Sequence, residues 1–299
     1  MFTTSRKFNQ IRRVFFNKEE KKFIKFNNFD NNKKSDNIVL VELKENYYGL
    51  IHLYFLLKKK EFKNSKIVGI WINPVKRNKG LQGFFAFLLD YIMDYFTKLK
   101  WNKIYRILGV NQSIDVNRNF RDNFFIKKSS FVSKNLKIKN KKEVLDINLK
   151  GIRVGDLIYD QYLRFYGKST FDVKDVFTFK RLLTYFENSY KNINNFYLKN
   201  KINIKYYIPQ NAVYIQGLIV RFFVNKNIKT IGGINSNKYV KKFTKNDYFH
   251  TTKCEDIKGK FEKLDNKKKK IRLSKEQLKK KFGGKITTEL NYVRKSSYN

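Results

Sequence analysis

The residues best suited to chemistry lie in one short run, residues 151–164, which reads GIRVGDLIYDQYLR. Gly155 and Asp156 stand where a short strand is predicted to give way to a helix. On that helix Asp156, Asp160 and Arg164 are spaced four residues apart and share one face. Two carboxylates on one turn repel each other, which raises the pKa of one of them toward the range of a general base.

The same spacing also has a purely structural interpretation, in which Asp156 caps the helix and Asp160 pairs with Arg164. We take Asp156 as the first candidate for a catalytic base, because it is nearest the strand end, and Asp160 as the second. Gly155, Tyr159 and Arg164 are candidate substrate-binding residues beside them.

A second candidate segment, residues 209–217, reads PQNAVYIQG and also joins a predicted strand to a predicted helix. Gln210, Asn211 and Tyr214 carry amide and hydroxyl groups that suit sugar hydroxyls, although a capped turn before a buried helix explains them equally well. Open α/β sheets bind ligands at the carboxyl ends of their strands. We therefore expect residues 155–160 and 209–214 to line one crevice at that edge.

The elements that must position these residues alternate between apolar strands and helices, which predicts a Rossmann-like parallel sheet flanked by helices over about residues 38–236. A basic lead-in, residues 1–37, precedes this domain, and a basic helical extension, residues 237–299, follows it. Strands are predicted at 37–43, 66–72, 103–110, 202–208 and 229–234, and helices at 47–62, 81–98, 173–199 and 212–224.

The charge balance is strongly basic: 66 Lys and Arg against 25 Asp and Glu give a net charge of +41. Such a surface attracts nucleic acid, anionic lipid or phosphorylated glycans. The codon preference of an AT-rich genome for Lys, Asn, Ile, Phe and Tyr explains the excess equally well. The single cysteine, Cys254, excludes a disulfide framework and a cysteine-rich zinc site, which indicates a reducing, cytoplasmic environment. No apolar segment is long enough to predict a membrane span.

Three segments, 151–164, 211–221 and 278–285, resemble, in this order, a signature of bacterial capsule and lipopolysaccharide biosynthesis proteins. These proteins are glycosyltransferase-like and of the two-lobed GT-B type, and the resemblance covers about residues 38–299. It implies an N-terminal, acceptor-binding lobe that works without a metal, with a nucleotide-sugar donor as co-substrate. One departure is that a histidine often precedes the Val-Tyr pair in the family, where this chain has Asn211 or a neighbour.

The resemblance also implies partners. The donor would be held by a second lobe, and the sequence stops at Asn299, where that lobe should begin. We therefore expect a fragment, a partner chain that supplies the lobe, or a catalytic assignment that is wrong. The acceptor would be a lipid-linked or phosphorylated glycan, with the protein peripheral at the anionic inner membrane face. Two alternatives stay open: a non-enzymatic nucleic-acid-binding or ribosome-associated protein, and a scaffold derived from an enzyme.

Overall fold

The computed structural model describes residues 15–26, 36–45, 64–72, 80–116, 138–166, 172–234, 239–249 and 257–282, and the single residues 50, 53, 62 and 170. The chain divides into two compact units, Met1–Thr251 and Thr252–Asn299. The predicted helix at 47–62 lies largely outside the described residues, although Leu50 and Leu53 are described and buried.

The first unit is built on a six-stranded sheet in the order β3-β2-β1-β6-β7-β8, which confirms the predicted Rossmann-like α/β fold. All neighbouring strands are parallel except β7 and β8. From the centre the chain winds outward through β2 and β3 on one side and through β7 on the other, so β1 and β6 flank a topological switch point. The strands are β1 (Ile38–Leu43), β2 (Lys66–Trp71), β3 (Val110–Asp115), β6 (Ile204–Ile208), β7 (Lys229–Ile234) and β8 (Tyr239–Phe243).

Both faces of the sheet are covered, because the apolar residues of its central strands alternate between two cores. Val39 and Val41 of β1 pack with Trp101 and Tyr105 of helix α4 (Gly80–Arg106). Leu40 of β1 packs on the other face with helices α8 (Gly155–Tyr166), α9 (Val176–Asn200) and α10 (Tyr214–Asn225). A short helical turn, η2 (Val173–Asp175), leads into α9.

The helix predicted at 81–98 is confirmed but continues as α4 to Arg106, so the strand predicted at 103–110 is wrong. Ile104 and Tyr105 lie on the buried stripe of α4, which keeps this segment helical. The end of α4 leads into tight turns over residues 104–109. Gly109, with a φ of 82°, then turns the chain into β3. The strand therefore occupies Val110–Asp115.

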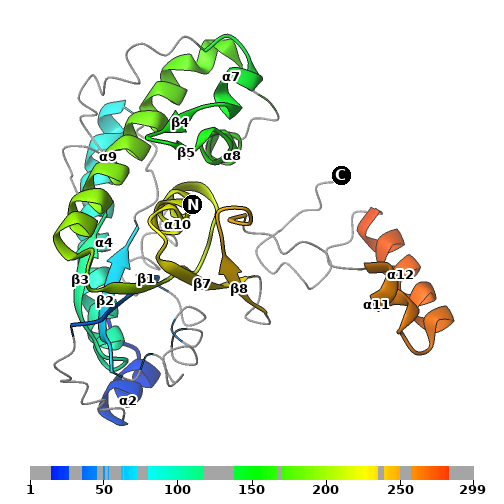
Figure 1. The fold of residues 1–299 in the computed structure, drawn as a ribbon, viewed down its shortest axis with the longest axis horizontal. Coiled ribbons are helices and arrows are strands. Elements are labelled where there is room, and N and C mark those ends of the chain that lie inside the picture. Colours follow the sequence, from blue (N-terminus) through cyan, green and yellow to red (C-terminus); the bar gives the residue numbers. More distant parts are fainter. Residues whose placement is uncertain are drawn as a thin grey trace. The chain divides into compact units, whose positions relative to one another are not determined.

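The segment before Asp156 also differs from expectation. Ile152–Arg153 forms strand β5, which among the described residues pairs with β4 (Asn148–Leu149) in a two-stranded antiparallel sheet separate from the main one. Lys150 and Gly151 have φ values of 51° and 82°, as the turn of a tight hairpin requires. Figure 1 shows this hairpin beside α8 and helix α7 (Lys141–Leu145), away from the main sheet. The sequence-based prediction that Gly155 lies at the carboxyl edge of the parallel sheet is therefore wrong.

One further segment departs from the sequence-based expectation, and the basic lead-in contains a helix. Residues 239–243, expected to be helical, form β8, and residues 18–26 of the lead-in form helix α2 (Lys18–Phe26). The main chains and side chains of Asn17 and Glu20 bond reciprocally at 2.8 Å to cap α2. Glu20 also forms a buried ion pair with Lys100 at 2.8 Å, which holds α2 against α4 within the first unit.

The described part of the second unit is helical: α11 (Ile257–Glu262) is followed by α12 (Lys267–Phe282). No helix in the described parts of the chain is both long and apolar enough to cross a bilayer.

Candidate functional site

Asp156, the first candidate base, is held by an arginine of α10. Its two carboxylate oxygens accept hydrogen bonds from Arg221 Nη1 at 2.7 Å and Nη2 at 2.6 Å. Arg221 is buried, and its guanidinium also lies over the ring of Tyr248 at 4.4 Å. Burial alone would raise the pKa of Asp156, but the hydrogen bonds and charge of Arg221 outweigh it and lower that pKa below its ordinary value. A carboxylate held ionised in this way is a poor proton acceptor.

Asp160, one turn further along α8, is exposed. Partial burial and the negative charge of Asp156 raise its pKa, as expected for two carboxylates on one turn. Arg164, which the sequence pairs with Asp160, donates from Nη1 to the hydroxyl of Tyr214 at 2.9 Å and lies over its ring.

Gly155 and Tyr159 serve packing. A Cβ on Gly155 would lie 2.1 Å from the carbonyl oxygen of Val144, so only glycine lets α8 approach the backbone of α7 this closely. Tyr159 is buried in the core, with the ammonium of Lys141 over its ring at 5.1 Å. Both positions, expected to bind substrate, face α7.

The two predicted segments meet along α8 and α10, but not as one crevice. Asp156 contacts Arg221, whereas Arg164 contacts Tyr214, so the two helices run antiparallel. Arg221 is seven residues beyond Tyr214, which corresponds to roughly 10 Å along α10. Asp156 and the loop that precedes Tyr214 therefore lie at opposite ends of this helix pair.

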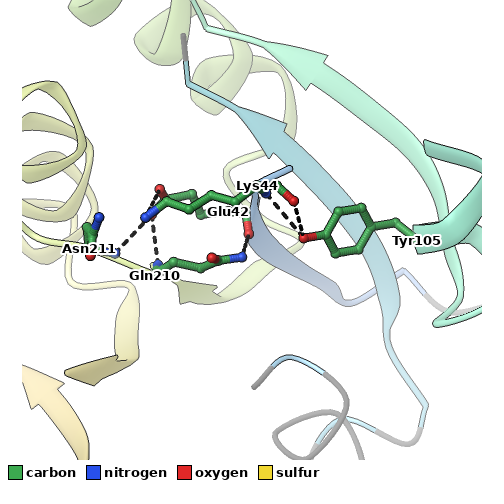
Figure 2. Close-up of polar contacts among 5 residues, drawn as sticks. All are labelled: Glu42, Lys44, Tyr105, Gln210 and Asn211. Carbon is green, nitrogen blue, oxygen red and sulfur yellow. Dashed lines mark hydrogen bonds and ion pairs between the residues drawn. The ribbon is translucent and has the colours of Figure 1, made fainter. Parts of the chain in front are cut away.

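Gln210 and Asn211 do lie at the carboxyl edge of the main sheet, directly after β6, and they converge there on Glu42 of β1 (Figure 2). Glu42 Oε2 accepts the main-chain N–H groups of Gln210 at 2.7 Å and of Asn211 at 3.3 Å. The side-chain amide of Gln210 donates to the carbonyl oxygen of Glu42 at 2.9 Å. These bonds join the ends of β1 and β6 at the switch point of the sheet.

Lys44 and Tyr105 complete this cluster. Lys44 Nζ lies 3.5 Å from Glu42 Oε1, and it donates to the Asn211 side-chain oxygen at 2.5 Å once the amide is oriented to satisfy its neighbours. The Tyr105 hydroxyl donates to the carbonyl oxygen of Lys44 at 2.8 Å and accepts from its N–H at 3.2 Å. We call Glu42, Lys44, Tyr105, Gln210 and Asn211 the switch-point cluster.

The carboxyl of Glu42 is the unusual group of the cluster, since it is only 1% exposed on a strand that is otherwise apolar. Burial raises its pKa above the ordinary value, and the opposing effects of Lys44 and the two N–H groups do not cancel the shift. Its Oε1 has no hydrogen-bond partner within the described residues. Burial also raises the pKa of Tyr105 to about 12, so this phenol stays protonated.

Such a cluster can bind and deprotonate a hydroxyl. It offers one carboxylate with a raised pKa, one ammonium group and neutral amides, all at the edge where open α/β sheets bind ligands. Within the described residues no group of three or more His, Cys, Asp or Glu side chains is placed to hold a metal.

Sequence reasoning missed Glu42, although a signal was present. The strand reads Ile-Val-Leu-Val-Glu-Leu, and a single acid near the carboxyl end of a buried strand is costly unless it has a use.

The fold and the cluster together define a doubly wound α/β protein with a polar site at its switch point. No family model and no solved structure matches the chain. A curated protein that matches is the DNA-directed RNA polymerase subunit beta'' of Marchantia polymorpha, which is 30% identical over 210 residues. The match covers 69% of this chain but 14% of that subunit, so the chain spans about one seventh of the relative's length.

Proposed function

We propose that the first unit is the acceptor-binding lobe of a glycosyltransferase-like protein of surface-polysaccharide synthesis, with the acceptor hydroxyl at Glu42. The observation that carries this proposal is the buried carboxyl with a raised pKa at the switch point. The neighbouring amides suit sugar hydroxyls. The six residues that follow β1, 44–49, read KENYYG and do not form a GxGxxG pattern, whereas the pyrophosphate of a dinucleotide needs a glycine-rich turn there.

In this proposal Glu42 Oε1 accepts the proton of the acceptor hydroxyl as its oxygen bonds to the sugar and the nucleotide leaves the donor. A carboxylate with a raised pKa is a stronger base near neutral pH than an ordinary one. The ammonium group of Lys44 lies 3.5 Å from Oε1, and in this proposal the Lys44 side chain, which is 21% exposed, moves aside when the acceptor enters. Transfer needs no metal, and Asp156 is left with a structural role.

The basic charge supports the acceptor class in this proposal. A lipid-linked or phosphorylated glycan would be attracted to a chain of net charge +41, and it would place the protein at the cytoplasmic face of a membrane.

Binding of oligosaccharides to the full chain tests the site directly. Saturation-transfer NMR with a panel of neutral and phosphorylated oligosaccharides should show contact in the wild type. Glu42→Gln keeps the shape of the side chain but removes the negatively charged carboxylate that would accept the hydrogen bond of the glycan hydroxyl, so it should weaken oligosaccharide binding by about tenfold or more. Lys205→Met, at the exposed amino end of β6, is the matched control and should bind as the wild type does.

Two outcomes would contradict the proposal: no oligosaccharide contact at all, or equal affinities for Glu42→Gln and Lys205→Met. Where nucleotide-sugar turnover is measurable, Glu42→Gln should abolish it and Asp156→Asn should spare it in the protein that remains folded.

A further inference from the structure

The second unit carries a surface that the proposed glycan site does not use. In this unit every described side chain from 261 to 279 is exposed. Asn266, with a φ of 54°, accepts the N–H of Lys270 at 3.1 Å and begins the α12 helix. A helix of 16 residues is only marginally stable in water by itself, and the described side chains of α12 give it no buried face. Such a helix gains most from a surface that covers it.

The charge of α12 indicates the sign of that surface. Four lysines, Lys267–Lys270, fill the first turn, where the helix dipole disfavours cations, and no acidic side chain shares that turn. Neighbouring like charges add repulsion. The described side chains of the helix include seven basic residues and one acid, Glu276; the basic residues are Lys267, Lys268, Lys269, Lys270, Arg272, Lys275 and Lys279. An anionic surface would relieve both penalties.

The apolar residues of α12 distinguish between kinds of anionic surface. Ile271 and Leu278 are seven residues apart, so they share one face, and they are 39% and 49% exposed. Lys268 and Lys275, also seven residues apart, lie along one side of this face, and their long stems can reach headgroups while the aliphatic side chains enter deeper. Nucleic-acid phosphates offer aliphatic side chains no comparable contact.

We propose that α12 is a membrane-docking helix that lies in the headgroup plane of an anionic lipid bilayer. Ile271 and Leu278 point toward the acyl chains, and the lysines contact the lipid phosphates. This inference adds to the membrane location in the proposed function, but the surface does not depend on Glu42, so a failure to bind vesicles would leave the proposed glycan site untouched.

Sedimentation of the full chain with vesicles tests the proposal. Phosphatidylcholine vesicles should bind little protein, and vesicles that also contain phosphatidylglycerol should bind it in a salt-dependent way. Replacing Lys267–Lys270 with glutamine should lower the partition coefficient by about tenfold or more. The double variant Ile271→Ser, Leu278→Ser should lower it by about tenfold.

Leu273→Ser is the matched control, because Leu273 is equally exposed but lies on the opposite face of α12, and it should bind within about twofold of the wild type. If Leu273→Ser and the double variant lowered the partition coefficient equally, the assignment of Ile271 and Leu278 to the inserted face would be wrong. Two other results would overturn the proposal: no preference for vesicles that contain phosphatidylglycerol, or full vesicle binding by the lysine variant.

Discussion

Replacing Asp156 with asparagine separates a structural role from a catalytic one. The side chain of Arg221 is 3% exposed and that of Asp156 is 24% exposed, so the change leaves a buried cation without its counterion. Breaking a fully buried pair from one side costs about 3–5 kcal/mol. In the variant Arg221 still donates to the carbonyl oxygen of Arg153 at 2.6 Å and still lies over the ring of Tyr248. The pair is also not fully buried, because Asp156 is partly exposed to water. We therefore expect a loss of about 2–3 kcal/mol of unfolding free energy.

Urea unfolding can be followed through the two tryptophans, Trp71 and Trp101, which are both buried. Arg221→Met should cost less than Asp156→Asn, because a partly exposed carboxylate in the first turn of a helix is tolerated. The double variant should show a coupling of about 2 kcal/mol. A loss near 1 kcal/mol for Asp156→Asn, with additive effects in the double variant, would mean that Asp156 is only a helix cap and would refute the reasoning.

Three other predictions concern packing, pH and charge. Gly155→Ala should destabilise the first unit by more than about 2 kcal/mol through its clash with the α7 backbone, whereas Gly151→Ala meets open space and should cost about 1–2 kcal/mol for its positive φ, both by urea unfolding. Burial raises the pKa of Glu187 to about 7, so its contribution to stability is complete below pH 4.5 and is lost as the pH rises through 7. Between pH 4.5 and pH 7 the free energy of unfolding of Glu187→Gln should therefore rise relative to that of the wild type by up to about 3 kcal/mol. The same dependence of unfolding free energy on pH in both proteins would contradict this. Nucleic-acid binding by the full chain, measured by fluorescence anisotropy, should fall steeply with salt and show no sequence preference, and a salt-resistant preferred site would favour a nucleic-acid-binding function.

The sheet was largely predictable from the sequence because its central strands are continuous apolar runs. The end of α4 was not, since residues 103–110 mix charged and apolar side chains in a way that fits a strand as well as a helix. The hairpin before Gly155 was misassigned because a two-residue strand carries too little pattern to reveal its partner.

The candidate site was predictable only in part. Gln210 and Asn211 were identified as polar groups at the end of a strand, and they do lie at the carboxyl edge of the main sheet. Glu42 bonds to Gln210 across 168 residues of sequence, a pairing that no local pattern encodes. Asp156 and Arg221 are likewise 65 residues apart, so the carboxylate that looked available is neutralised by a distant arginine.

The two outer strands of the sheet have a consequence for self-association. An unpaired strand edge is a template for joining another chain, and aggregation starts readily at flat apolar edges. β3 presents the polar residues Asn111 and Gln112 at one edge, both exposed. At the other edge, β8 buries the charged residue Lys241, which bonds to Asp247 at 2.5 Å, and exposes Lys242. A strand of another chain that paired with β8 would lie beside the exposed Lys242, and a charged side chain on an edge strand disfavours such pairing.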